Sequence, residues 1–260
     1  MEQKSTLREI NVNRYITPLR EGGSMPAIIE GDDDFLYVLK FRGAGQGTKA
    51  LIAELIGGEI ARKLGFKVPE LVFAHLDRAF GRTEPDEEIQ DLLRFSEGLN
   101  LALHYLSGSI TYDPVVNDID QLTASKVVWL DSYLMNMDRT AKNTNMLIWH
   151  KELWLIDHGA SLYFHHSWHN WKEQAQKPFK LIKDHVLLKK ATQIEEADKE
   201  LSHLIDDTFL DNLVDMIPES WLNDSPFDSV TDHKAAYKQY LKERRDYSSE
   251  VIVKEVQNAG

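Results

Sequence analysis

The sequence predicts an α+β fold in which strands come early in the chain and helices make up most of the rest. Two observations support this prediction. Between residues 7 and 106, short runs of alternating apolar and polar residues are separated by turns rich in glycine, proline and aspartate, which is typical of strands. Apolar residues recur at helical spacing from about residue 120 to 135 and again from residue 183 onward, with breaks near Pro218 and Pro226.

The periodicity of each run assigns it to an element. We expect strands at residues 7–20, 27–30, 35–41, 68–76 and 100–106, and a hairpin formed by 146–149 and 153–156. We expect helices at residues 48–64, 87–93, 120–135, 184–190, 193–205, 207–217 and 232–256. Thr48 should cap the first of these helices and Gly65 should end it. Asp118 or Asp120 should cap the helix that ends near Met135.

The size of the chain fits one domain with two lobes, or two small domains that share an interface. It has 260 residues, 42% hydrophobic and 28% charged, which is enough for a substantial core. We place the division at residue 106, with an N-terminal lobe at 1–106 and a C-terminal lobe at 107–260. Cysteine is absent, which excludes disulfides, thiolate metal sites and a thiol nucleophile.

The net charge is −12, and acidic residues are spread along the chain instead of being massed in a tail. Such a surface repels phosphate backbones, which argues against direct nucleic-acid binding. No apolar run approaches the roughly 20 residues of a membrane span, and the first ten residues contain no signal-peptide core. We therefore expect a cytoplasmic protein that does not contact membranes.

The stretch from Asp131 to Ser161 carries the clearest chemical signal. It begins as the end of an apolar helix, breaks into a polar run containing Asp138 and Asn143, and passes through the hairpin to Asp157. Phosphoryl transfer needs an Asp to orient the attacking hydroxyl, and an Asn and a second Asp to hold magnesium. Asp and Asn are common in any loop. The hairpin and the D-x-G that starts at Asp157 favour the catalytic core of a protein-kinase-like fold.

At these positions the sequence resembles the HipA-like kinases. The resemblance is carried by MNMDRTAKNTNMLIW (residues 135–149) and LWLIDHGASL (153–162), and it spans about residues 20–220. It implies a small β-rich N-terminal lobe, with a mixed sheet and one main helix above it, and a larger, mostly helical C-terminal lobe. It also implies that ATP and Mg²⁺ bind between the lobes, with Asn143 and Asp157 as the metal ligands.

Lys40 and Glu54 are candidates for the nucleotide-phosphate site. Lys40 lies on a strand between apolar neighbours, where a long cation is unusual. It is either a lysine at the edge of the sheet with its ammonium in water, or the strand lysine that pairs with nucleotide phosphates and a helix Glu. The resemblance favours the second reading, because Glu54 and the ARKLG run at 61–65 match the family pattern for this helix.

Two backbone segments are further candidates for ATP binding. The turn Gly22, Gly23, Ser24 precedes a short strand, and its two glycines allow backbone amides to approach an anion. A plain surface turn explains it equally well. By resemblance, Ser24 is also a candidate for autophosphorylation. The second segment, His104, Tyr105 and Leu106, is either an ordinary strand and turn or the connector between lobes that meets the adenine edge.

A zinc site is one interpretation of the histidines at 165, 166 and 169, because His165 and His169 are four residues apart. No Cys or nearby carboxylate completes a set of ligands. An aromatic-rich loop packed beneath the active site is the better interpretation.

By resemblance, the chain is expected to be a kinase with a serine or threonine of a protein as acceptor. Several HipA-like kinases are toxins of toxin–antitoxin pairs that phosphorylate aminoacyl-tRNA synthetases. The resemblance therefore allows for an antitoxin-like partner protein. This chain is short, however, and carries Thr140 where those toxins usually have His. Its glycine turn also differs from G-x-G-x-x-G. The toxin role and the acceptor therefore stay open, and a small-molecule kinase and a pseudokinase scaffold remain alternatives.

Overall fold

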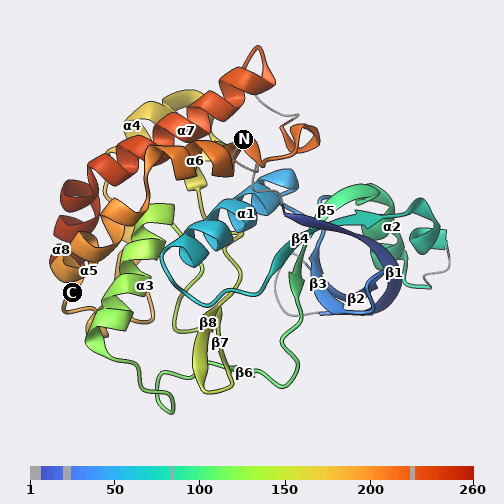
Figure 1. The fold of residues 1–260 in the computed structure, drawn as a ribbon, viewed down its shortest axis with the longest axis horizontal. Coiled ribbons are helices and arrows are strands. Elements are labelled where there is room, and N and C mark those ends of the chain that lie inside the picture. Colours follow the sequence, from blue (N-terminus) through green and yellow to red (C-terminus); the bar gives the residue numbers. More distant parts are fainter. Residues whose placement is uncertain (1–6, 20–24, 83–84, 223–225) are drawn as a thin grey trace.

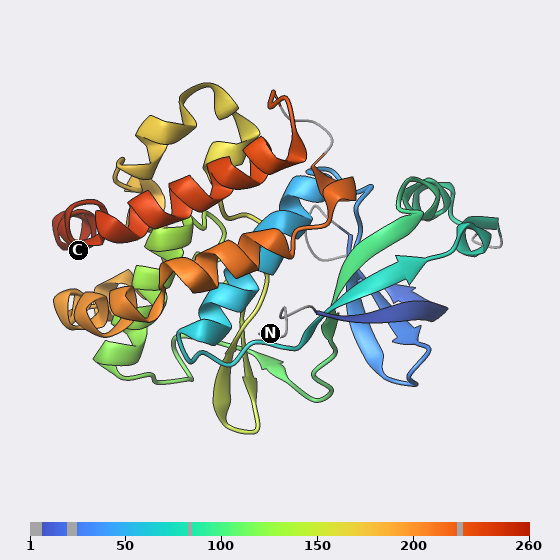
Figure 2. The same ribbon diagram turned by 45° about the horizontal axis from the view of Figure 1, so that its top comes forward.

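The computed structural model describes residues 7–19, 25–82, 85–222 and 226–260. Strands and helices are both present, as predicted, and they separate in space (Figures 1 and 2). A closed five-stranded barrel occupies one end of the molecule and a group of helices the other. Helix α1 (Thr48–Lys63) runs between them.

The barrel is built from strands that the alternation predicted, with small shifts at their ends. Its order is β1 (Arg8–Pro18), β2 (Ala27–Gly31), β3 (Leu36–Lys40), β5 (Gly98–His104) and β4 (Leu71–Leu76). All neighbours are antiparallel except β1 and β4, which run parallel and close the barrel. The sheet is therefore mixed, as expected, but it closes on itself instead of lying open beneath a helix. Helix α2 (Glu87–Phe95) contributes to the interior, whose buried residues include Ile10, Ile29, Leu39, Val72, Ala102, Ile89 and Leu93.

Helix α1 packs into the larger core, which it shares with the C-terminal helices. Leu51, Leu55, Ile56 and Ile60 are buried there, so α1 is covered on most of its circumference. Thr48 does not cap the helix as predicted. Gly47 precedes the first turn, and the Thr48 hydroxyl instead donates to the carbonyl of Trp221 at 2.9 Å, which ties α1 to the C-terminal part of the chain.

Helix α3 (Gln121–Leu134) is buried along most of its length in the helical part, and Asp120 caps it, as one of the two predicted residues. Its Trp129 is fully buried and donates to Asp198 at 2.7 Å. The surrounding helices are α4 (Trp171–Ala175), α5 (Ile194–Leu201), α6 (Asp207–Asp215), α7 (Val230–Asp246) and α8 (Lys254–Ala259). A small sheet of β6 (Ile110–Thr111), β7 (Met146–Trp149) and β8 (Glu152–Leu155) contains the predicted hairpin.

The helices expected at 184–190 and 232–256 are both interrupted. Residues 180–184 and 188–190 form two short 3₁₀ turns, because His185 between them is extended and bridges to Thr140 instead of continuing a helix. The last long helix ends at Asp246, and one π-helical turn at 249–253 joins it to α8.

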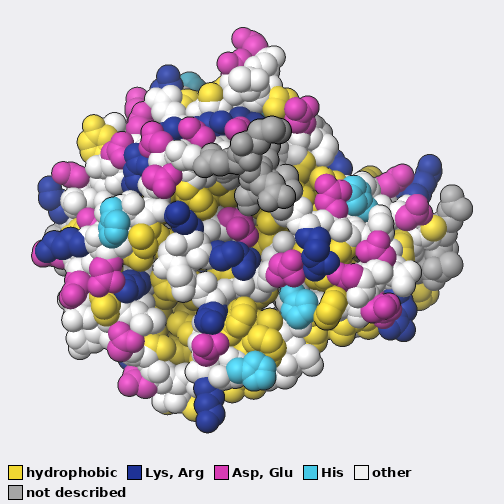
Figure 3. Space-filling model, in the orientation of Figure 1, with side chains coloured by type: hydrophobic (Ala, Val, Ile, Leu, Met, Phe, Trp, Pro, Cys, Tyr) yellow, Lys and Arg dark blue, Asp and Glu magenta, His cyan; other side chains and the backbone are white. Residues whose placement is uncertain are grey.

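Charges of both signs are mixed over the face of the molecule shown in Figure 3, although the chain as a whole carries −12. Within the described residues, none of the helices combines the length and the apolar character needed to cross a bilayer. The predicted division of the chain at residue 106 stays a prediction.

Candidate active site

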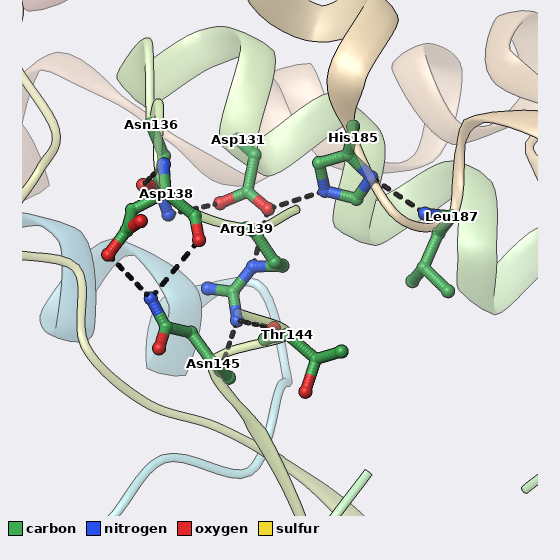
Figure 4. A network of polar contacts seen from close by, with 8 residues as sticks. All are labelled: Asp131, Asn136, Asp138, Arg139, Thr144, Asn145, His185 and Leu187. Atoms are coloured by element: carbon green, nitrogen blue, oxygen red, sulfur yellow. Dashed lines mark hydrogen bonds and ion pairs between the residues drawn. The ribbon is translucent and has the colours of Figure 1, made fainter. Parts of the chain in front are cut away.

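A buried ion-pair network fixes the loop that follows α3 (Figure 4). Asp131, near the end of α3, is fully buried and accepts from Arg139 Nε at 2.6 Å and from Asn136 Nδ2 at 2.9 Å. His185 Nε2 lies 2.8 Å from the same carboxylate, and its Nδ1 accepts from the amide of Leu187, so Nε2 carries the proton. Two donors from the loop after α3 and a third from His185, 54 positions away, therefore converge on one carboxylate.

The network acts on the pKa of Asp131. Burial opposes ionisation of this carboxyl, but the charge of Arg139 and the hydrogen bond from His185 hold its pKa well below the usual range. Arg139 also donates to the carbonyl of Asn145. The path of the chain from Asp131 to Asn145 is thus set by one charged side chain in the interior.

That path presents Asp138 and Asn143 to solvent side by side. Asn143 Nδ2 donates to Asp138 Oδ2 at 2.8 Å, and Asn145 Nδ2 reaches the same oxygen at 3.4 Å. The Asp138 amide donates to the side chain of Asn136 at 3.2 Å. The carboxylate of Asp138 is therefore held in one orientation by two amide side chains.

The hairpin brings Asp157 to the same place. The amide of Ile156 donates to the carbonyl of Asn145 at 3.1 Å, and Asp157 follows with a left-handed backbone, φ 56°. Asp is among the few residues that tolerate this conformation. The side chain of Asp157 is 36% exposed and accepts from Lys40 Nζ at 2.7 Å.

Lys40 lies between two carboxylates. Besides its 2.7 Å contact with Asp157, its ammonium is 3.8 Å from Glu54 on α1. Burial alone would lower the pKa of Lys40, but the charges of Asp157 and Glu54 raise it above its ordinary value. Burial likewise opposes ionisation of Glu54, yet the charge of Lys40 and the neighbouring imidazole of His158 hold its pKa below the usual range.

His158 packs beneath Glu54. Both side chains are buried, and His158 Nδ1 is 3.7 Å from a Glu54 oxygen. Gly57, one turn further along α1, makes this approach possible: a Cβ at that position would stand 2.6 Å from the Cβ of His158. The residue after Asp157 thus supports the helix glutamate from below.

A cleft of about 1660 Å³ lies next to this cluster of polar groups. The predicted residues Lys40, Glu54, His104, Tyr105, Leu106, Asp138, Asn143 and Asp157 all border it. Gly22, Gly23 and Ser24 lie outside the described residues. The cleft is also bordered by Ala44, Gly45, Gln46 and Gly47, the connector before α1, to which the sequence analysis gave no role.

The side-chain oxygens in the cleft suit a hard cation that takes its other ligands from a bound substrate and water. Asp157 and Asn143 offer carboxylate and amide oxygens, which magnesium prefers, and magnesium commonly takes its remaining ligands from phosphates and water. In the described part of the chain, no group of three or more His, Cys, Asp or Glu side chains could hold a metal alone. His165 is buried and contacts the hydroxyl of Tyr237 at 3.0 Å, in keeping with an aromatic loop.

Sequence reasoning missed the groups that hold the site in place. The sequence offered a clue to Asp131, which is a charged residue near the end of an otherwise apolar helix. It also offered a clue to Arg139, which directly follows Asp138, the predicted base. His185 carried none, because its contact with Asp131 joins residues 54 positions apart. Gly57 could have been noticed as a glycine inside a helical run.

A family model described as HipA-like kinase matches residues 12–250. The chain belongs to the HipA-like kinase family. Its fold is shared by the Helicobacter pylori proinflammatory kinase CtkA, with a TM-score of 0.57 and 15% identity over 98% of this chain and 96% of that one. A Golgi casein kinase follows with a TM-score of 0.50 and 11% identity over 96% and 74%. No curated protein matches this HipA-like kinase. Family and fold support a phosphotransferase.

Replacing Asp131 by Asn should destabilise this HipA-like kinase by about 3–5 kcal/mol at neutral pH, because Arg139 would be left as a buried charge without its partner. The pKa of the Asp131 carboxyl is lower in the folded state than in the unfolded state. Its contribution to the free energy of unfolding is therefore present above about pH 4 and is lost as the pH falls below that value. Urea denaturation of both proteins from pH 7 downward should show the difference shrinking only below about pH 4.

The exposed neighbour Asp184 supplies the control, since Asp184→Asn changes the same charge outside the network. A stability loss in Asp131→Asn no larger than that of Asp184→Asn would show that the network contributes little.

Proposed function

We propose that this chain is an ATP- and Mg²⁺-dependent protein kinase that transfers the γ-phosphoryl group to a serine or threonine hydroxyl. The observation that carries the proposal is the meeting of Lys40, Glu54, Asp138, Asn143 and Asp157 in one cleft. They come from a barrel strand, helix α1, the loop after α3 and the end of a hairpin. A structural ion-pair cluster would not need an oriented, part-exposed Asp beside an amide.

Asp138 fits the role of the residue that orients the acceptor and takes its proton. Its carboxylate is partly exposed in the cleft and is held by Asn143 and Asn145. When bound, Mg²⁺ would be held by Asp157 and Asn143 and would neutralise charge on the phosphates. Lys40, already in the cleft and kept charged by Glu54, supplies a second positive group for those phosphates.

We place the nucleotide between the barrel and the helical part, which is the two-lobed arrangement with division at residue 106. The amides of His104 and Tyr105 donate to the carbonyls of Glu70 and Leu36. Leu106 follows them at the border of the cleft, so its backbone is our candidate for the adenine contact. A toxin–antitoxin role and an antitoxin partner rest on family resemblance alone.

Asp138→Asn should lower turnover by at least ~100-fold while Mg-ATP binding changes little, because positioning and proton acceptance are lost but the phosphate contacts remain. Turnover is measured as ³²P transfer or ADP release, and binding by calorimetry. Asp113→Asn serves as control, because Asp113 borders the same cleft and its hydrogen bond to the Val115 amide can be kept by Asn. Equal turnover in Asp138→Asn and Asp113→Asn would remove Asp138 from the mechanism.

Asp157→Asn should instead abolish the Mg-dependent part of nucleotide binding, because an amide cannot replace a carboxylate charge on the metal. A thermal shift with ATP, measured with and without Mg²⁺, reports this directly. Persistence of the wild-type Mg²⁺ effect in Asp157→Asn would rule out this residue as a metal ligand.

Lys40→Met should raise the dissociation constant for Mg-ATP by about tenfold or more, since a charge-assisted contact with phosphate is lost at nearly constant side-chain volume. The exposed Lys199→Met is the matched control. If both variants bind Mg-ATP like the wild type, Lys40 serves only the ion pairs seen in the structure.

Autophosphorylation of Ser24 also remains a proposal. Mass spectrometry after incubation with Mg-ATP would detect a phosphate on Ser24, and the Asp138→Asn variant is the control, in which the phosphate should be absent.

A further inference from the structure

The segment of residues 162–190, which follows Asp157, has a charge opposite to that of the chain. It contains six lysines and two carboxylates, whereas the whole chain carries −12. Two of its lysines are paired: Lys190 lies 2.5 Å from Asp118, and Lys177 lies 3.9 Å from Glu173. The others leave a surplus of positive charge.

Lys180 and Lys183 form a pair on the surface of this segment. Both are exposed, and in the described part of the chain no carboxylate lies within 4 Å of either ammonium. They occupy the 3₁₀ turn at 180–184, where residues three apart eclipse, so both side chains leave the turn on the same side. Ile182 between them is buried and anchors the turn.

This turn is joined to the loop after α3 that carries Asp138 and Asn143. Thr140 and His185 form an antiparallel bridge, and the amide of Val186 donates to the carbonyl of Arg139 at 3.1 Å. In an antiparallel bridge, the residues after Thr140 and those before His185 leave in the same direction. The chain at Ala141 and the chain at Asp184 therefore leave the bridge in the same direction, and each leads to a lysine: Lys142, which borders the cleft, and Lys183.

We propose that Lys180 and Lys183, together with Lys142, bind an acidic segment of the protein acceptor next to its phosphorylated hydroxyl. The proposal rests on the function proposed above and adds the class of acceptor. In the reaction, the acceptor oxygen forms a bond to the γ-phosphorus and the bond from that phosphorus to the β–γ bridging oxygen breaks. ADP keeps the electron pair, and the acceptor proton passes to Asp138.

A short acidic peptide fits this surface better than a nucleic acid does. The lysines are confined to one turn and one loop residue, and the remainder of the chain is acidic. A long polyanion would meet that acidic surface beyond the lysines, whereas a few carboxylates beside a serine would not.

The test is phosphorylation of a degenerate peptide library with one fixed serine or threonine. We expect wild-type protein to select Asp or Glu near the fixed residue, and Lys180→Glu/Lys183→Glu to lower kcat/KM for the selected peptides by about tenfold or more. Mg-ATP binding should be the same in both proteins, because neither lysine borders the cleft. The charge-reversed protein should gain relative activity on peptides with Lys or Arg at those positions.

Lys189→Glu/Lys199→Glu is the control, because it makes the same charge change at exposed lysines that border a separate hollow near the C-terminus. A library without acidic preference, an equal loss in the control, or no labelling by protein that turns over Mg-ATP would overturn the proposal. So would stronger competition by a single-stranded oligonucleotide than by polyglutamate. Failure to bind Mg-ATP at all would contradict the proposed kinase function instead.

Discussion

The structure of the site depends on one carboxylate that is out of contact with water. Asp131 joins the end of α3, the loop that carries Asp138 and the segment before α5 through Asn136, Arg139 and His185. A buried charge is strongly unfavourable unless every lone pair finds a donor, so the surrounding chain has few alternative arrangements that satisfy it. The positions of Asp138 and Asn143 follow from this constraint, because they lie between Asn136 and the anchored Asn145.

A second constraint acts across the cleft. Lys40 on β3 contacts Asp157 and Glu54, so one cation connects the barrel, helix α1 and the end of the hairpin. With Asp138 nearby, the cleft contains more carboxylates than this ammonium can neutralise. Such an imbalance favours the binding of a further cation, and magnesium carried in with nucleotide phosphates is of the right kind.

Local pattern predicted the elements and most of the candidate residues, since strands, α1, α3 and the hairpin have clear periodicity. Lys40, Glu54, Asp138, Asn143 and Asp157 were all selected from sequence, and the structure brings them together. What could not be predicted depends on distant contacts. His185 breaks an expected helix because Thr140 and Asp131 bind it, and the β1–β4 pairing that closes the barrel joins strands far apart in sequence. Thr48 does not cap α1 because its own hydroxyl donates to the carbonyl of Trp221, a residue far along the chain.

His158 shows how the two constraints meet. It directly follows Asp157, and it fills the space beneath Glu54 that Gly57 leaves open. A shift of α1 away from the hairpin would separate Glu54 from Lys40 and expose His158 together. A shift of the hairpin would move Asp157 and His158 as one unit. The geometry of the cluster formed by Lys40, Glu54 and Asp157 is therefore coupled to the packing of α1 on the helical part, whose core α1 shares through Leu55 and Ile56. The position of α1 determines whether Lys40 is held by one carboxylate or by two.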